Sequence, residues 1–529
     1  MENLNKKIVN ELLASEIKTR EELMALKRRL AKKFGKELPT NTELLAELPR
    51  NADTQQLQRL LRRRSIRTMS GIAPVAVLTK PFACPGKCAY CPTEKDVPQS
   101  YLSNEPAVMR AIHCGYDPYK QVQYRLRALM ANGHEPDKIE LIVIGGTWSV
   151  LPVEYKYWYI LNCYAAANNF SLAGRKTQHA RCGAKLSLGR MKERLVVEQR
   201  RNETAKHRII GLTLETRPDY IDERELQEMR EFGCTRVELG VQAIDDKILE
   251  MNKRGHDLAA VTAATALLRR FGFKITYHLM PGLPGSTPAK DLKMFKQLFS
   301  DERFQPDQIK FYPTVVTKGS LLYDWWRQGK YKPYSDKVLQ RLIVDCKAAI
   351  PHYVRIIRLV RDIPGESIIA GNTVTNLRQV MQQRGVACNC IRCREVRDQS
   401  DGPVNLSMES YDVTGGKEEF IEFASQDRKT LHGFCRLFLP AKEGTGGGFL
   451  PDTAIVRELH VYGELVPIGG KQKTQHSGLG RRLLEKAEAD ASAGGFKNMA
   501  VIAGVGVRGY YRKTGYRLRR SYMVKRLPA

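Results

Sequence analysis

The chain has 529 residues, and its 86 lysines and arginines outnumber its 57 acidic residues, giving a formal net charge of +29. This length predicts about three domains of ~150 residues each. The charge favours a polyanionic partner such as nucleic acid, with an ordinary solvated basic surface as the alternative. No apolar run approaches the roughly 20 residues that span a bilayer, and the first residues lack the apolar segment of a secretory signal, so we expect a soluble cytoplasmic protein with no membrane partner.

Residues 1–70 are predicted to form a basic helical region. Apolar residues recur there at helical spacing, and Thr19 followed by Glu22 fits a capping box at a helix start. The region holds sixteen basic and nine acidic residues, including the run Arg62-Arg63-Arg64. Such a region suits contact with phosphates, and a solvated helical face fits the charge equally well.

Residues 71–365 are predicted to form an α/β domain. Apolar strands alternate with helical segments such as 258–271. The predicted strands are 75–78, 139–147, 208–217, 236–242, 274–280 and 308–312. This spacing indicates a parallel sheet that closes into a full or partial TIM-type barrel. Glycines and polar residues cluster where the strands end, which is the edge that carries the active sites of barrel enzymes.

Three cysteines, Cys84, Cys88 and Cys91, follow the first strand of this domain. Thiolates are the usual ligands of iron–sulfur clusters, and a four-iron cluster normally takes four. Three ligands therefore leave one iron open to bind a small molecule and pass it an electron. The spacing favours a cluster over the alternative, a structural zinc site with a fourth ligand elsewhere.

Two further segments stand out before residue 405. Residues 171–208 hold eleven basic and three acidic residues, so they form a second candidate contact with nucleic acid or, alternatively, a charged surface loop. Residues 366–404 are predicted to be a linker. In it, Cys388, Cys390 and Cys393 favour a compact zinc site over free thiols, although the spacing identifies no fourth ligand.

Residues 405–529 are predicted to form a separate domain with an antiparallel sheet. A strand at 454–462 precedes the glycine-containing segment 475–481, which opens a helix through residue 491. Backbone N–H groups at such a helix start bind anions well. The order of strand, glycine turn, helix and the pair Tyr510-Tyr511 matches the pyrophosphate-binding turn of acyl-CoA-dependent acetyltransferases, whereas both tyrosines could equally be ordinary packing residues.

Taken together, these motifs closely resemble the family of the Elongator catalytic subunit and its stand-alone bacterial and archaeal relatives, the tRNA uridine acetyltransferases. The resemblance covers nearly the whole chain and joins a radical-SAM cysteine loop to a C-terminal GNAT-type domain. The matching segments are 90–92, 109–112, 145–147, 214–219, 236–242, 280–285, 457–463, 475–476 and 509–513.

This resemblance implies a 4Fe-4S cluster on Cys84, Cys88 and Cys91 that binds and reductively cleaves SAM. The resulting radical would take hydrogen from the methyl group of acetyl-CoA, and the carbon radical would add to C5 of the tRNA wobble uridine. Hydrolysis of the thioester would leave a 5-carboxymethyl group. The implied SAM contacts are Gly145, Gly146, Glu215 and Arg217. The implied acetyl-CoA contacts are Lys138, Glu458, Leu459, His460, Val461, Leu479, Gly480, Arg481 and Tyr511.

Among these residues, His460 or Glu458 would position or activate water, and Tyr510 or Tyr511 would assist at the thioester. The implied partners are tRNA, acetyl-CoA and an electron donor, with zinc as an additional metal and a homo-oligomer left open. Two other functions are weighed against this one. One is a protein lysine acetyltransferase with a structural cluster, and the other is a tRNA-binding scaffold with little catalysis.

Overall fold

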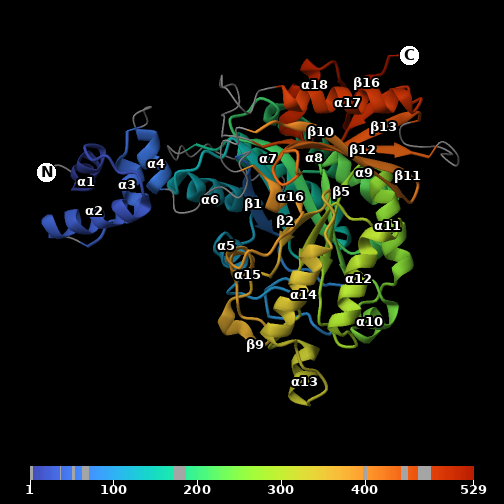
Figure 1. Ribbon diagram of the computed structural model, residues 1–529, viewed down its shortest axis with the longest axis horizontal. Coiled ribbons are helices and arrows are strands. Elements are labelled where there is room, and N and C mark those ends of the chain that lie inside the picture. Colours follow the sequence, from blue (N-terminus) through green and yellow to red (C-terminus); the bar gives the residue numbers. More distant parts are fainter. Residues whose placement is uncertain are drawn as a thin grey trace.

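The computed structural model of this protein describes residues 4–35, 37–49, 54–61, 71–171, 186–396, 402–441, 451–462 and 478–528. Figure 1 shows a group of helices at the N-terminal end, a central α/β part and a C-terminal sheet with its helices. None of the helices in these ranges combines the length and the apolar character needed to cross a membrane. Arg62, Arg63 and Arg64, residues 172–185 of the basic insertion, and residues 475–476 lie outside the described residues.

The N-terminal part is helical, as predicted. Its helices are α1 (Leu4–Leu13), α2 (Arg20–Lys33), α3 (Asn41–Glu47) and α4 (Gln55–Leu61). The capping box at the start of α2 is confirmed, because Thr19 and Glu22 exchange side chain–backbone hydrogen bonds. Leucines at helical spacing on these helices bury a small core of their own. The group therefore stands beside the central part in Figure 1 and meets it where α3 contacts α6.

Seven parallel strands form the central sheet in the order β1-β2-β3-β4-β5-β6-β8. They are β1 (Ala73–Leu78), β2 (Lys138–Ile144), β3 (Arg208–Thr216), β4 (Arg236–Gln242), β5 (Lys274–Leu279), β6 (Gln308–Phe311) and β8 (Arg355–Arg358). The partial barrel predicted from the strand spacing is confirmed. The sheet has one strand more than the six predicted, because the sequence of β8, Arg-Ile-Ile-Arg, is too short to show a period.

The helices of this part surround the sheet or project beyond it (Figure 1). They are α5 (Pro106–His113), α6 (Pro118–Ala131), α7 (Val153–Asn168), α8 (Leu188–Asn202), α9 (Glu223–Glu231), α10 (Asp246–Met251), α11 (Leu258–Arg270), α12 (Pro288–Ser300), α13 (Leu321–Arg327), α14 (Asp336–Ala348), α15 (Leu377–Gln383) and α16 (Ile391–Arg394). Short 3-10 turns η2 (Trp148–Val150), η3 (Pro218–Tyr220) and η4 (Gly365–Ser367) and a small antiparallel pair, β7 (Val316–Thr317) with β9 (Ile368–Ala370), complete this part. The described end of the basic insertion is thus helix α8.

The C-terminal sheet has the order β10-β11-β12-β13-β14-β16-β15 and is antiparallel except where β13 pairs with β14. Its elements are β10 (Asn405–Val413), β11 (Gly416–Ala424), β12 (Leu431–Pro440), β13 (Thr453–Val461), α17 (Leu479–Ala493), β14 (Asn498–Val501), η5 (Val505–Val507), α18 (Arg508–Lys513), β15 (Arg517–Arg519) and β16 (Tyr522–Arg526). The parallel pairing stops at Val456, so the last residues of β13 separate from β14.

The C-terminal sheet packs on the end of the barrel where the parallel strands begin. Lys274, the first residue of β5, pairs with Glu458 of β13 at 3.4 Å. Gly504, just before η5, lies so close to β3 that an added Cβ would fall 1.9 Å from the backbone oxygen of Ile210. Buried Asp307, one residue before β6, accepts hydrogen bonds from Arg457 of β13 at 3.0 and 2.5 Å. The two parts are therefore fixed to each other by close backbone contact and by buried charge.

Gly504→Ala is expected to destabilise the protein by about 1–3 kcal/mol, because the new methyl group would overlap the backbone of β3, which cannot swing aside as a flexible side chain can. Urea unfolding of the full chain measures the effect. Gly509→Ala is the matched control, since its Cβ would meet nothing within 4 Å and it lies within helix α18, where alanine is favoured over glycine. Equal unfolding midpoints for the two variants would contradict the close packing described here.

Candidate active site

The cysteine loop leaves β1 at the end of the sheet opposite the C-terminal domain, and backbone hydrogen bonds hold it in place. Ala89 N–H donates to the Asn252 carbonyl at 3.0 Å, and the Ala89 carbonyl accepts from Leu322 N–H at 2.7 Å. Cys88 is buried, whereas Cys84 and Cys91 are partly exposed. The loop is thus anchored to two segments from the far side of the barrel, which keeps its thiols at the carboxyl ends of the strands.

The surroundings of Cys88 favour its thiolate. Hydrogen bonding from Cys91 and the nearby Arg254 guanidinium lower the pKa of Cys88 to about 5, against the opposing effect of burial. Arg254 Nη1 donates to Cys88 Sγ at 3.4 Å. A thiolate is the form that binds metal, so the chemistry of the Cys88 donor fits a metal cluster. Sequence reasoning missed Arg254, although its position in the short basic segment Lys253-Arg254-Gly255-His256 was visible.

The predicted SAM-binding residues lie beside this loop, at the ends of the adjacent strands β2 and β3. Gly145 and Gly146 follow β2 with φ of 128° and 102°, in the region that favours glycine. The residue after them, Thr147, places its Oγ1 3.9 Å from Cys84 Sγ. Parallel pairing of β1, β2 and β3 therefore brings these glycines and the cysteine loop to one edge of the sheet.

Arg217 follows β3 and reaches under the cysteine loop. Its Nε and Nη2 donate to Asp219 at 2.9 and 2.8 Å, but its buried Nη1 has no hydrogen-bond partner in the described residues. An added Cβ on Gly86 would lie 2.5 Å from that Nη1. The loop thus leaves an oriented N–H donor free beside the cysteines, which suits an anionic group such as a carboxylate.

The buried side chain of His256 lies beside Asp219, the partner of Arg217, and near Arg254. Its side chain is fully buried, its Nδ1 is 3.8 Å from Asp219 Oδ1, and neither ring nitrogen has a hydrogen-bond partner in the described residues. Burial, together with the cation of Arg254, lowers the pKa of His256 to about 3, so the ring is neutral. His256 was missed in the sequence, because a lone histidine carries no pattern.

Charged side chains also lie in the interior of the barrel. Among those named below, Glu215 alone was predicted to contact a ligand, namely SAM. His278 of β5 contacts Glu215 of β3 at 3.3 Å and Glu238 of β4 at 3.0 Å, and Lys310 of β6 pairs with the same Glu238. Glu215 also accepts from Tyr101 at 3.2 Å. The visible signal was the charge at alternate positions of strands that are otherwise apolar, which places these residues on the inner face.

The predicted acetyl-CoA residues on β13 divide between the two faces of the strand. Leu459 and Val461 pack against the core under α17, whereas Glu458 and His460 face the barrel. Side chains alternate along a strand, so four consecutive residues cannot all point to one ligand. The backbone of β13 beyond Val456 no longer pairs with β14, so this edge of the strand is available to a ligand.

Glu458 is held in ion pairs that connect the two parts of the protein. Arg436 donates to its carboxylate at 3.1 Å, and Lys274 lies at 3.4 Å. These cations outweigh burial and lower the pKa of Glu458 to about 2. A carboxylate this acidic is a weak base at neutral pH, so its arrangement suits positioning better than proton abstraction.

His460 lies between aromatic rings on the same face. Its ring is 4.4 Å from that of Tyr462 and 6.0 Å from that of Phe434, with the latter nearly parallel. Burial, aided by nearby cations that include Lys138, lowers the pKa of His460 to about 3. Lys138 is the first residue of β2, so the structure brings it together with His460 at the end of the barrel away from the cysteine loop.

Replacing His460 with glutamine is expected to change how stability depends on pH. The folded pKa lies below the unfolded value, so the unfolded chain binds the extra proton first, and this group removes stability as pH falls below about 6.5. The loss reaches at most about 2 kcal/mol by pH 5, at about 1.4 kcal/mol per pH unit. Urea unfolding of both proteins at pH 7.5 and pH 5 tests it. The parent should lose more of its free energy of unfolding than His460→Gln between pH 7.5 and pH 5. Equal losses in the two proteins would contradict the low pKa of His460.

The remaining predicted acetyl-CoA residues gather at the start of α17. Gly478 caps this helix with φ of 80°, and an added Cβ on Gly480 would lie 3.2 Å from Tyr510 Oη and 3.4 Å from Val461. Arg481 is exposed and pairs with Glu485, one turn along the helix. The helix start, the end of β13 and Tyr510 thus converge. Tyr511 instead lies in the core against Tyr516, where burial raises its pKa.

The second cysteine group lies at the junction of the barrel and the C-terminal sheet. The Sγ atoms of Cys388, Cys390 and Cys393 all lie within 4.8 Å of one another, a spacing that could hold a metal ion. Arg394, in the same segment, donates to Glu422 of β11 at 2.8 Å. Zinc at this site stays a prediction, and its position suits a structural tie between the two parts.

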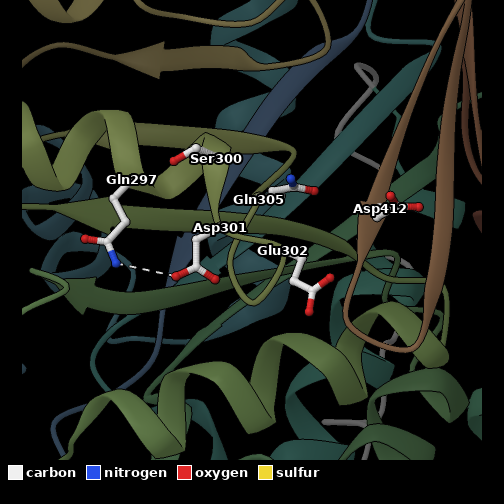
Figure 2. A pocket seen from close by; sticks show the side chains of 6 residues that line it. All are labelled: Gln297, Ser300, Asp301, Glu302, Gln305 and Asp412. Atoms are coloured by element: carbon white, nitrogen blue, oxygen red, sulfur yellow. Dashed lines mark hydrogen bonds between the residues drawn. The ribbon is translucent and has the colours of Figure 1, made fainter.

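A polar hollow of 660 Å³ opens between the loop after α12 and β10 (Figure 2). Its lining is acidic, with Asp301, Glu302 and Asp412, and Gln297 donates to Asp301 at 3.4 Å. The hollow lies at the domain junction, away from the cysteine loop and from α17, and contains none of the predicted site residues. Its negative charge is unsuited to phosphate.

Comparison with known proteins finds three family models that match parts of this chain. The family model of the radical SAM superfamily matches residues 80–298. The model of the radical SAM C-terminal domain matches 306–385, and that of the ELP3 N-terminal domain matches 1–69. A tRNA uridine(34) acetyltransferase of Dehalococcoides mccartyi is 45% identical over 87% of this chain and 99% of its own length. Elongator complex protein 3 of Homo sapiens is 37% identical over 96% of this chain and 93% of its own.

A solved structure agrees with these sequence matches. The archaeal Elp3 of Methanocaldococcus infernus, with residues 1–46 deleted, superposes with a TM-score of 0.71 at 36% identity, covering 87% of this chain and all of that one. The identity and the coverage extend across the barrel and the C-terminal sheet. This chain therefore belongs to the radical SAM family that comprises the tRNA uridine(34) acetyltransferases and Elongator complex protein 3.

Proposed function

We propose that this chain modifies the wobble uridine of tRNA by attaching the acetyl group of acetyl-CoA, through its methyl carbon, to C5 of the base. The proposal is carried by one observation. The chain has a loop with three cysteines at the carboxyl end of the barrel, and a helix start suited to CoA at the other end, in two parts that are packed together. Relatives named tRNA uridine(34) acetyltransferase match this chain over nearly their whole length, which supports tRNA as the substrate.

Cys84, Cys88 and Cys91 would hold the 4Fe-4S cluster, which together with SAM supplies the radical that takes hydrogen from the acetyl methyl group. The low pKa of Cys88 supports this role. The free Nη1 of Arg217 would bind the SAM carboxylate, and the φ-positive glycines after β2 would let the ligand approach the backbone closely. Glu215 is oriented by Tyr101 and His278 at the same edge and would bind a polar group of SAM.

Acetyl-CoA would bind where α17 begins. Backbone N–H groups at Leu479, Gly480 and Arg481 would contact the pyrophosphate, because a helix start favours anions. The open edge of β13 at Leu459 and Val461 would pair with the pantetheine amides, with Tyr510 beside it. His460 and Lys138 would face the thioester from the barrel side, where a neutral imidazole orients water rather than activating it.

The two sites lie at opposite ends of parallel strands, so the acetyl group must be delivered over roughly 20 Å, the length of a seven-residue strand. The charged interior formed by Glu238, His278 and Lys310 lies between them. The chain's net charge of +29 supports tRNA, with its phosphate backbone, as the polyanionic partner.

Anaerobic full-length protein, reconstituted with iron and sulfide and given SAM, a reductant, acetyl-CoA and tRNA, is expected to form 5-carboxymethyluridine, which nucleoside mass spectrometry detects. Omission of SAM should abolish the product. Acetylation of protein lysines with no modified nucleoside would favour a lysine acetyltransferase. Absence of acetyl-CoA turnover both with and without tRNA would favour a binding scaffold.

A further inference from the structure

Arg254 is a buried cation that contacts the cysteine loop. The residue is 7% exposed, and its Nη1 donates to Cys88 Sγ at 3.4 Å. Within the described ranges it makes no ion pair with a carboxylate. Other buried arginines at the domain junction do, as when Arg457 pairs with Asp307. A buried charge without a counterion is costly, so this arginine requires negative charge at the cysteine loop.

The fold makes room for this arginine at the end of β4. Arg254 Nε donates to the Gly240 carbonyl at 3.1 Å, and Nη2 donates to the same oxygen. An added Cβ on Gly240 would lie 2.6 Å from Nη2. Anchoring through two nitrogens leaves the third aimed at sulfur, because the guanidinium is a planar fork with fixed donor directions. The arrangement is thus a built contact and not a chance approach of a flexible side chain.

We propose that Arg254 sets the reduction potential of the iron–sulfur cluster by donating a hydrogen bond and a positive charge to the Cys88 sulfur. Reduction adds one negative charge to the cluster. A cation and an N–H donor at a ligand sulfur stabilise the reduced form more than the oxidised form, and so raise the potential. Arg254 is in this sense a positioning residue, and the proposal rests on the cluster site proposed above.

The size of the effect follows from the burial of the pair. A unit charge several ångströms away, at an effective dielectric constant of about 20, changes a one-electron equilibrium by roughly tenfold or more. Removing the charge at Arg254 should therefore lower the ratio of reduced to oxidised cluster at a fixed potential by at least about tenfold, which corresponds to a midpoint at least about 59 mV more negative. Lysine keeps the charge but not the two-point anchor, so Arg254→Lys should fall between the parent and the neutral variant.

The experiment is a redox titration of the reconstituted full-length protein, in which the electron paramagnetic resonance signal of the reduced cluster is followed without substrate. Arg254→Met is compared with the parent, with Arg254→Lys, and with Lys253→Gln, which removes the same charge from the neighbouring exposed residue. A more negative midpoint for Arg254→Met alongside a parental midpoint for Lys253→Gln supports the proposal. A parental midpoint for Arg254→Met, with parental iron and sulfide content, overturns it.

Two controls keep the outcome distinct from that of the proposed function. If Arg254→Met takes up no cluster, Arg254→Gln replaces it in the same titration, because its amide keeps N–H donors but carries no charge. If Cys88→Ser binds as much iron and sulfide as the parent, the cluster site itself is misplaced and the proposed function fails. The proposal about Arg254 fails on a different result, in which every Arg254 variant assembles the cluster and all of them have the parental midpoint potential.

Discussion

Cys88→Ser is expected to abolish formation of 5-carboxymethyluridine, with a loss of at least about a thousandfold in rate. A serine hydroxyl stays protonated at neutral pH, whereas the Cys88 thiol has a pKa of about 5 and is a thiolate under the same conditions. Iron–sulfur clusters bind through thiolates, so the variant loses the ligand that lies deepest in the loop. The measurement is nucleoside mass spectrometry on anaerobic reactions, together with iron and sulfide analysis of the protein.

Cys114→Ser is the matched control for this loss. Cys114 is also a buried free thiol, but it follows α5 and belongs to neither cysteine group. Its replacement should leave iron content and product formation near the parent values. Product from Cys88→Ser at the parent rate would remove the radical interpretation, whereas equal losses from both variants would indicate damage to the fold rather than to the cluster site.

Asp307→Ala is expected to lower the free energy of unfolding by about 3–5 kcal/mol, the largest stability effect that we anticipate. Asp307 is fully buried, and its pKa is lowered because Arg457 and Arg436 outweigh the effect of burial. Its side chain also accepts from Ile275 N–H at 2.8 Å. Removing this carboxylate takes a shared counterion from Arg457 and Arg436, which keep Glu418 and Glu458 as partners, and so leaves excess positive charge in a buried site. Such a loss costs far more than an absent surface pair.

Urea unfolding of the full chain, followed by both far-ultraviolet circular dichroism and tryptophan fluorescence, measures this effect. Two probes are used because a chain with several parts need not unfold in one step. Asp345→Ala is the control, since Asp345 forms an exposed pair with Arg341 on α14 that is worth about 0–1 kcal/mol. Similar midpoints for the two variants would contradict a domain junction held by buried charge.

Local pattern was sufficient to predict much of this fold. The period of apolar residues located β1 to β6, and Thr19 with Glu22 marked the start of α2 because a capping box is a short-range device. The predicted strand at 454–462 and the helix following Gly478 are also present as β13 and α17. Strand β8 was missed, since two isoleucines flanked by arginines carry too little periodic signal.

The candidate site was predictable where it depends on spacing along the chain. Cys84, Cys88 and Cys91 lie within one loop, so their proximity is a local property of the sequence. The partners that surround them are not local. Arg254 reaches Cys88 across 166 positions, and Arg217 meets Gly86 across a similar separation, because the parallel strands bring their carboxyl ends to one edge.

The sequence by itself thus determined the composition of the protein's parts: a basic helical N-terminal region, a cysteine loop at the end of a first barrel strand, and a glycine helix start preceded by a strand. Tertiary structure alone decided how they are arranged. It placed the C-terminal sheet on the end of the barrel away from the cysteines, and it turned Glu458 into a partner of Arg436 and Lys274. The physical reason is that burial and ion pairing depend on neighbours from other elements, up to 184 positions away for Glu458, which periodicity and spacing do not encode.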